Sequence, residues 1–195
     1  MPEAQGVLGA VARVVAIFES LGVPYVVGGS FASGVWGRPR QTNDLDVEVI
    51  LDAARLDNVL SRLTNAFELS EQEAHAALAS EDPYRGFQLL DLETLFRVDV
   101  FLSDGSDFAR SCFDRALRVD LGSGTQAMVR SPEDTLLHKL AWYELGRRVS
   151  DRQWNDAAAI VETQGPRLDW AYLAAWALRL GVHESLDTLR AEVAG

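Results

Sequence analysis

Two short stretches, Val27-Gly28-Gly29-Ser30 and Asp44-Leu45-Asp46, decide the fold of this 195-residue chain. The first ends an apolar run, residues 23–27, whose composition predicts a short buried strand. The two glycines predict a tight turn after that strand, and Ser30 is a typical N-cap for a helix running to residue 36. Residues 28–30 are called the Gly-Gly-Ser turn below.

The second stretch opens a predicted strand, residues 44–51, in which acidic and apolar residues alternate. Successive side chains of a strand point to opposite faces, so Asp44 and Asp46 share one face while Leu45 points into the core. Two carboxylates on one face repel each other unless a cation lies between them. Oxygen ligands at this spacing suit Mg²⁺ or Mn²⁺, and the pair therefore predicts a divalent-metal site.

A third carboxylate fits the same site. Asp99 stands in a further predicted strand, residues 95–102, which we expect to form a hairpin with residues 86–91. If that strand pairs with residues 44–51, three carboxylates converge, and such a triad can hold two metal ions for an in-line displacement at phosphorus. The alternative for Asp99 is an ordinary surface position on a strand.

Neither the turn nor the Asp-x-Asp pair is specific alone. Glycines let the backbone approach a phosphate, and the N-terminus of the following helix offers N–H groups to the anion. The simpler alternative makes Asp44 a capping residue, and Asp46 and Glu48 a solvated strand face. The two motifs on successive strands, with a helix between them, favour the functional interpretation.

The run from Val27 to Asp46 resembles the nucleotidyltransferases of the polymerase-β type. Its Arg-x-Thr-x-Asp-Leu-Asp spelling is most similar to minimal, antibiotic-modifying and abortive-infection toxin-type members. The resemblance implies a triphosphate-binding turn, metal-binding aspartates and a general base at Asp99. The residues that it implies for catalysis and metal binding are Asp44, Asp46 and Asp99, and those for the nucleotide are Gly28, Gly29, Ser30, Arg40, Thr42, Lys139 and Asp156.

Three of these assignments have plain structural alternatives. Arg40 could simply balance the acidic strand, and Lys139 could be a solvated residue of an amphipathic helix. Lys139 and Asp156 match only in order and spacing a lysine and a later aspartate of the toxin-type members. That part of the resemblance is the loosest.

The predicted elements form an α+β fold. A small mixed β-sheet flanked by helices, over residues 1–130, precedes a C-terminal helical region, residues 131–195, which begins with the helix-start signal Ser131-Pro132-Glu133-Asp134. The expected strands are residues 23–27, 44–51, 67–69, 86–91, 95–102, 116–121 and 126–129, and the expected helices are residues 7–21, 30–36, 52–63, 71–79, 132–145, 151–163, 169–180 and 183–194.

Composition narrows the range of partners. A net charge of −11 disfavours an extended nucleic-acid surface, which would have to neutralise phosphates with basic residues. The single cysteine, Cys112, can form neither a disulfide framework nor a cysteine-based zinc site, and we expect it in the core. No apolar run reaches the roughly 18–20 residues that span a bilayer, so we expect no membrane partner and a cytoplasmic protein.

These observations predict a metal-dependent nucleotidyltransferase that uses a nucleoside triphosphate and Mg²⁺ or Mn²⁺. It would move a nucleoside monophosphate to a hydroxyl of an acceptor, which could be a small molecule, a protein or a tRNA. One alternative is a catalytically silent nucleotide-binding or partner-binding module of the same fold. Another is a toxin-like enzyme that modifies tRNA through a local basic path of Arg38, Arg40, Arg147, Arg148 and Arg152.

Overall fold

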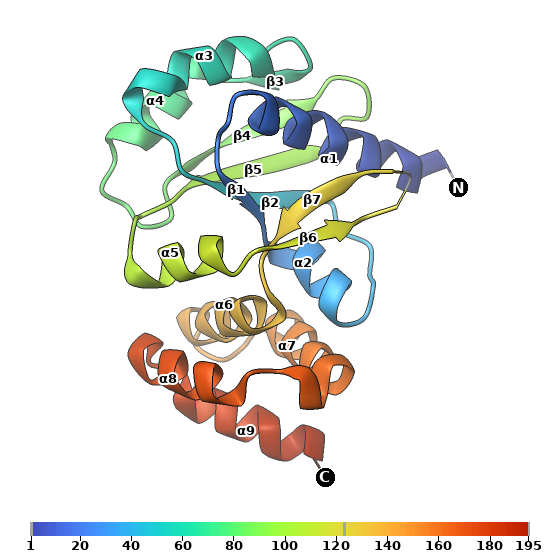
Figure 1. The fold of residues 1–195 in the computed structure, drawn as a ribbon, viewed down its shortest axis with the longest axis vertical. Helices are drawn as coiled ribbons and strands as arrows, with labels where there is room; N and C mark the ends of the chain where they lie inside the picture. Colours follow the sequence, from blue (N-terminus) through green and yellow to red (C-terminus); the bar gives the residue numbers. More distant parts are fainter. Residues whose placement is uncertain (1, 123, 195) are drawn as a thin grey trace. The chain divides into compact units, whose positions relative to one another are not determined.

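The computed structural model describes residues 2–122 and 124–194 and confirms the α+β fold, with a mixed sheet of strand order β3-β4-β5-β2-β1-β7-β6 (Figure 1). The chain divides into two compact units, one of residues up to 27 plus 43–129 and one of residues 28–42 plus those from 130 onward. We call them the sheet unit and the helical unit.

The sheet unit contains the helices α1 (Pro2–Ser20), α3 (Ala53–Leu63), α4 (Glu71–Ala79) and α5 (Asp107–Asp114) and the strands β1 (Tyr25–Val27), β2 (Asp44–Val49), β3 (Phe67–Leu69), β4 (Gly86–Asp91), β5 (Arg97–Leu102), β6 (Leu117–Asp120) and β7 (Gln126–Val129). The helical unit contains α2 (Gly29–Trp36), α6 (Pro132–Leu145), α7 (Asp151–Gln164), the short 3₁₀ helix η1 (Gly165–Arg167), α8 (Trp170–Leu180) and α9 (His183–Ala194).

The sheet combines both kinds of strand pairing. The β4–β5 hairpin is antiparallel, as predicted. The β6–β7 hairpin and the β1–β2 pair are antiparallel as well. In contrast, β2 pairs with β5 in parallel, and β1 pairs with β7 in parallel with Val27 opposite Val129. The parallel β2–β5 pair fulfils the condition on which the three-carboxylate prediction depended.

The core of the sheet unit lies under the apolar face of the central strands. Leu45, Val47 and Val49 of β2 have no exposed surface, whereas the alternate residues of the strand are half-buried. Figure 1 shows α1, α3 and α4 on one side of the sheet and α5 on the other. Cys112 of α5 is fully buried, as predicted for a small core residue.

Two local predictions were wrong in the sheet unit. The strand expected from residue 95 begins at Arg97, because Leu95 has a φ of 58° and belongs to the tight turn of the β4–β5 hairpin. Helix α5 was not expected at all. Its N-terminal signal is nevertheless ordinary, since the Ser106 side chain accepts a hydrogen bond from the backbone N–H of Ala109.

The helical unit includes α2, although the sequence had placed this helix with the preceding strands. Helix α2 packs on α6 and α7, and a Cβ added at Gly37 would lie 3.0 Å from the backbone of Ala159. The indole N–H of Trp36 donates to the carbonyl of Arg130 at 2.7 Å. Ser131 caps α6 as predicted, accepting from the backbone N–H of Asp134 at 3.1 Å.

None of the helices within residues 2–122 and 124–194 combines the length and the apolar character that crossing a bilayer requires.

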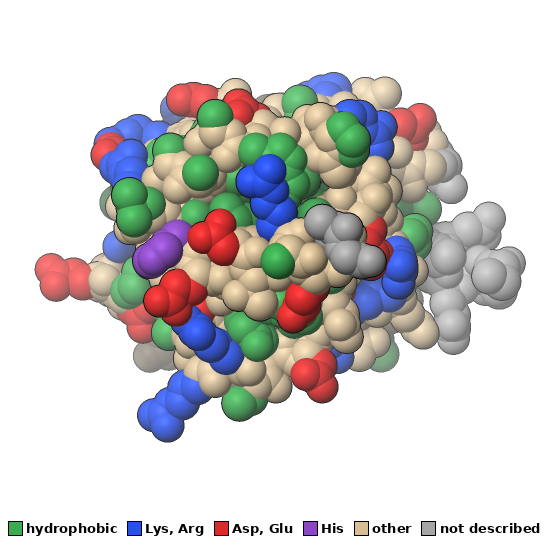
Figure 2. Space-filling model, turned by 90° about the horizontal axis from the view of Figure 1, so that it is seen from below, with side chains coloured by type: hydrophobic (Ala, Val, Ile, Leu, Met, Phe, Trp, Pro, Cys, Tyr) green, Lys and Arg blue, Asp and Glu red, His purple; other side chains and the backbone are tan. Residues whose placement is uncertain are grey.

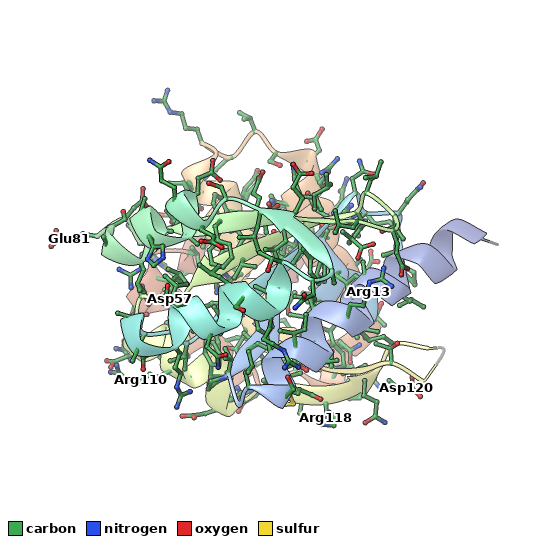
Figure 3. All side chains as sticks on the ribbon, turned by 90° about the horizontal axis from the view of Figure 1, so that it is seen from above. Arg13, Asp57, Glu81, Arg110, Arg118 and Asp120 are labelled. Atoms are coloured by element: carbon green, nitrogen blue, oxygen red, sulfur yellow. The ribbon has the colours of Figure 1, made fainter. Side chains whose placement is uncertain are left out.

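A buried ion pair ties the β4–β5 hairpin to α1, on which Figure 3 shows Arg13. Asp91 has a fully buried side chain and accepts from Arg13 Nε at 2.8 Å and from Nη2 at 2.7 Å. The same guanidinium reaches the exposed Glu93 at 2.8 Å. Burial raises the pKa of the Asp91 carboxyl, but hydrogen bonds from Arg13 and Thr94 outweigh it and leave the pKa below the ordinary value of 3.8.

We expect Asp91→Asn to lower the free energy of unfolding by about 2–3 kcal/mol, because it leaves a partly buried guanidinium without its anion. Glu93→Gln is the matched control, since it removes an exposed partner of the same arginine and should cost about 0.5 kcal/mol or less. Urea denaturation of the two variants measures the difference. Equal losses of unfolding free energy in the two variants would contradict the assignment of Asp91 as the main partner of Arg13.

The Asp91 contribution should also depend on pH. Because the folded-state pKa is lowered, the ionised carboxyl stabilises the protein above the unfolded-state pKa. The contribution is lost as the pH falls through the folded-state value. We therefore expect the gap in stability between wild type and Asp91→Asn to be full at neutral pH and to shrink below about pH 4.

Candidate active site

The three predicted carboxylates lie on two adjacent strands of the sheet unit. In the parallel ladder of β2 and β5, Asp46 stands directly opposite Asp99, and Asp44 stands opposite Arg97. Residues two apart on a strand share a face, so these four charged side chains occupy one face of the strand pair. The register thus sets Asp46 opposite Asp99 with Asp44 on the same face, which is the strand pairing that the three-carboxylate prediction required.

An arginine that the sequence analysis did not select lies among these carboxylates. Arg97 Nη2 is 2.6 Å from Asp44 Oδ2, and Arg97 Nε is 3.2 Å from Asp99 Oδ2. One guanidinium therefore bridges carboxylates of two strands. The signal was present in the sequence, because Arg97 precedes Asp99 by two residues and must share its face.

Asp99 is the most buried of these ion-paired groups, with a side chain 16% exposed against 29% for Asp44. Its Oδ1 atom is buried and has no hydrogen-bond partner among the described residues. Burial raises the pKa of the Asp99 carboxyl above its ordinary value, opposed by Arg97, and the charge of Asp44 raises it further. A carboxyl whose pKa is raised in this way holds a proton more readily than an exposed one, which suits a general base.

The donor chemistry of this face fits a divalent ion. Carboxylate oxygens are the ligands that Mg²⁺ and Mn²⁺ prefer, and the buried Oδ1 of Asp99 is an acceptor without a donor. Within the described part of the chain, no three carboxylate, histidine or cysteine side chains are gathered as a ready metal cage. Arg97 instead provides the positive charge between Asp44 and Asp99.

The Gly-Gly-Ser turn opens α2 in the helical unit, and its two glycines are needed for different reasons. Gly29 has a φ of 56°, which side-chain-bearing residues rarely adopt. Gly28 has an ordinary φ, but a Cβ there would lie 3.0 Å from Nη1 of Arg130. The buried Arg130 guanidinium therefore lies directly against the backbone of the turn.

The predicted N-cap was wrong, because α2 begins at Gly29 and Gly28 is its N-cap, with no side-chain capping bond. Ser30 is the second residue of the helix, and its hydroxyl instead accepts a hydrogen bond from Arg40 Nη2 at 2.5 Å. The turn is thus shaped by glycine conformation, and the Ser30 side chain is oriented by a cation.

Four of the nucleotide-binding candidates meet in one charged cluster of the helical unit. Asp156 of α7 accepts from Arg40 at 2.9 Å through both Nε and Nη2, and Lys139 Nζ of α6 lies 2.9 Å from Asp156 Oδ2. Arg40 in turn donates to Ser30. Ser33, which the sequence analysis did not select, adds a bond to Asp156 at 3.2 Å.

The ion pair of Lys139 with Asp156 is the buried part of this cluster. The side chains of Lys139 and Asp156 are 5% and 10% exposed, so Lys139 is not the solvated lysine of the structural alternative. Burial raises the pKa of Asp156, but bonds from Arg40 and the charge of Lys139 outweigh it and lower the pKa overall. Two cations thus share one ionised carboxylate beside Ser30.

Thr42 is the remaining nucleotide-binding candidate. Thr42 lies half-buried in the loop that precedes β2.

Arg38 and Arg148 of the predicted basic path form ion pairs with acidic residues. Arg38 pairs with Glu162 at 2.6 Å, and Arg148 pairs with Glu144 at 2.8 Å and with Glu184. Figure 2, which views the side of the C-terminal helices, shows acidic, basic and apolar side chains interspersed.

Comparison with known proteins gives matches of structure only. No protein-family profile and no curated protein sequence matches the chain. The antibiotic-resistance factor ANT(2'')-Ia matches with a TM-score of 0.55 and 13% identity, over 94% of this chain and 98% of the other. An antigenic nucleotidyltransferase-like protein from Paracoccidioides brasiliensis matches with a TM-score of 0.53 and 19% identity, over 93% and 91% of the two chains.

The chain has the nucleotidyltransferase fold. This agrees with the family that the run from Val27 to Asp46 resembles. At such low identity the likeness extends to the fold alone, and the chemistry of the site has to be argued from its own residues.

The two glycines of the turn can be tested by alanine substitution. We expect Gly29→Ala to lower the free energy of unfolding by about 1–2 kcal/mol through its positive φ. Gly28→Ala should cost a similar amount by pushing Arg130 away from the turn. Gly34→Ala is the control within α2, because its Cβ would meet only ordinary contacts at 3.8 Å or more, and it should stabilise the helix by about 0.5–1 kcal/mol. Chemical denaturation measures the three free energies of unfolding. A loss of stability in Gly34→Ala as large as in the other two variants would contradict the roles assigned to Gly28 and Gly29.

The Asp156 cluster makes a second prediction. Asp156→Asn should lower the free energy of unfolding by about 3 kcal/mol or more, because the buried Lys139 and the partly buried Arg40 lose an anion that they share. Glu162→Gln is matched on the same helix, where its partner Arg38 is 76% exposed, and it should change stability by about 0.5 kcal/mol at most. Similar unfolding midpoints for the two variants would show that the cluster is not held by charge.

Proposed function

We propose that this protein is a metal-dependent nucleotidyltransferase. It transfers a nucleoside monophosphate from a nucleoside triphosphate to a hydroxyl group of an acceptor and releases pyrophosphate. The observation that carries the proposal is the register of β2 and β5, which sets Asp46 opposite Asp99 and Asp44 two residues before Asp46, within a nucleotidyltransferase fold.

Asp44, Asp46 and Asp99 would hold the metal. A divalent ion bound by them neutralises charge on the reacting phosphate and lowers the pKa of a hydroxyl bound to it. The buried Oδ1 of Asp99 supports this role, because it is an acceptor that no donor of the described residues satisfies. Mg²⁺ and Mn²⁺ both suit such a set of oxygen ligands.

Asp99 would also act as the general base. The acceptor oxygen forms a bond to the α-phosphorus while the bond from that phosphorus to the bridging oxygen breaks, and the pair of electrons leaves with pyrophosphate. The hydroxyl proton passes to the Asp99 carboxylate. The raised pKa of Asp99 favours this proton transfer, because it makes the carboxylate more basic than an exposed aspartate.

The Gly-Gly-Ser turn and the Asp156 cluster would bind the triphosphate. Backbone N–H groups at the start of α2 and the hydroxyl of Ser30 are donors to phosphate oxygens. Arg40 and Lys139 supply positive charge, and Asp156 acts as a positioning residue that orients both.

The acceptor follows from none of these features, so the test must not presuppose it. The protein is incubated with α-labelled nucleoside triphosphates, Mg²⁺ and a cell extract, and the transfer of label is compared between wild type and Asp44→Ala/Asp46→Ala. We expect the double variant to lose at least about a hundredfold in rate, because the metal ligands are removed. Glu68→Ala, an exposed acidic residue on β3 of the same sheet, is the control and should keep the wild-type rate.

Two results would contradict the proposal. Equal label transfer by wild type and the double variant would show that Asp44 and Asp46 take no part in the reaction. Mg²⁺-dependent nucleotide binding without pyrophosphate release from any acceptor would instead make the protein a binding module of the same fold. Both are measured with the same labelled nucleotides.

A further inference from the structure

The side chain of Arg97 occupies a special place on the carboxylate face. Arg97 is the first residue of β5, lies opposite Asp44 in the parallel ladder, and precedes Asp99 by two residues on the same strand. Its neighbours on this face of the strand pair are therefore acidic.

The bonds of Arg97 make it a bridge between two strands. Nη2 bonds to Asp44 Oδ2 at 2.6 Å, and Nε lies 3.2 Å from Asp99 Oδ2. Both carboxylates therefore direct one oxygen toward the same planar guanidinium. Without a cation at this point, the like charges of Asp44 and Asp99 would repel each other.

The guanidinium approaches from the solvent side. The Arg97 side chain is 46% exposed, whereas those of Asp44 and Asp99 are 29% and 16% exposed. A half-exposed arginine can rotate into water without opening the core, and exposed ion pairs of this kind are weak. The contact is therefore one that a stronger cation can replace.

We propose that Arg97 is the internal counter-ion of the carboxylate site and that a divalent metal ion displaces it. This inference rests on the proposed function, because it concerns the same metal ligands. Mg²⁺ lies about 2.0–2.1 Å from its oxygen ligands. An ion bound by both Asp44 and Asp99 would occupy the space that the guanidinium now fills, and two cations do not share it.

Charge supports the exchange. Arg97 places one positive charge between the carboxylates of Asp44 and Asp99. A divalent ion places two positive charges there and bonds more closely, so it competes effectively for the oxygens. The arginine keeps the ligand-free site together and weakens metal binding, since every metal ion that enters must first break the arginine contacts.

The test measures metal binding directly. Mn²⁺ binding is followed by electron paramagnetic resonance of the free ion for wild type, Arg97→Gln and Arg97→Lys. We expect Arg97→Gln to bind Mn²⁺ about five- to tenfold more tightly, because one competing charge has gone. Arg97→Lys keeps the charge and should stay within about twofold of wild type.

Arg118→Gln is the matched control. Arg118 lies on β6 of the same unit (Figure 3), is 51% exposed and pairs with Glu19 at 3.1 Å, so it resembles Arg97 in exposure and pairing but touches none of the three aspartates. Its removal should leave the Mn²⁺ affinity unchanged. Without metal, Arg97→Gln should also melt about 2–5 °C below wild type, and saturating Mn²⁺ should remove that difference.

A measurement on the wild-type protein tests the displacement of Arg97 even if the Arg97 variants fail to fold. The Arg97 Nε–H resonance should report the contact with Asp99 in the metal-free protein, and it should shift on saturation with diamagnetic Mg²⁺. An unchanged resonance at saturation would overturn displacement.

The outcomes separate this inference from the function on which it rests. If wild type and Arg97→Gln bind Mn²⁺ equally, while Asp44→Ala/Asp46→Ala does not bind it, the metal site stands and the role of Arg97 is wrong. If none of the proteins binds Mn²⁺ better than the double variant, the proposed metal site itself is wrong.

Discussion

The parallel pairing of β2 with β5 is the constraint on which the candidate site depends. The two strands are far apart in the chain, and their register alone decides which side chains meet across the ladder. A slip of one residue would turn Asp99 toward the core and bring an apolar side chain to the carboxylate face. Buried Leu45, Val47 and Val98 prevent that slip, because each would lose its place in the apolar core.

The same core therefore holds repelling charges together. Carboxylates on one face disfavour the folded state unless a cation compensates them, and the structure supplies Arg97 for this purpose. The helical unit presents the reverse case, in which Arg40 and Lys139 are held together by Asp156. In each unit a side chain of opposite charge lies between two like charges: Arg97 between Asp44 and Asp99, and Asp156 between Arg40 and Lys139.

The turn that opens α2 shows how backbone and charge act together. Gly29 adopts a conformation that side chains oppose, and Gly28 leaves room for the guanidinium of Arg130. Because β1 and β7 are parallel with Val27 opposite Val129, the chain leaves both strands side by side, and the next residues are Gly28 and Arg130. Arg130 therefore follows β7 at the position where Gly28 follows β1.

The sequence by itself determined the α+β class, nearly all of the helices and strands, and the two motifs of the site, because period-two alternation, helical spacing and glycine signals are local properties of the chain. It also indicated that Asp44 and Asp46 share a face, which follows from strand geometry alone. Arg97 could have been found by the same rule, since it stands two residues before Asp99.

Only the tertiary structure decided which distant residues meet. The opposition of Asp46 and Asp99, the approach of Arg130 to Gly28, and the joining of Ser30, Arg40, Lys139 and Asp156 all depend on strand register and helix packing between segments far apart in sequence. Local patterns contain no information on such register. For the same reason the sequence placed α2 with the strands, whereas its packing against α6 and α7 places it with the C-terminal helices.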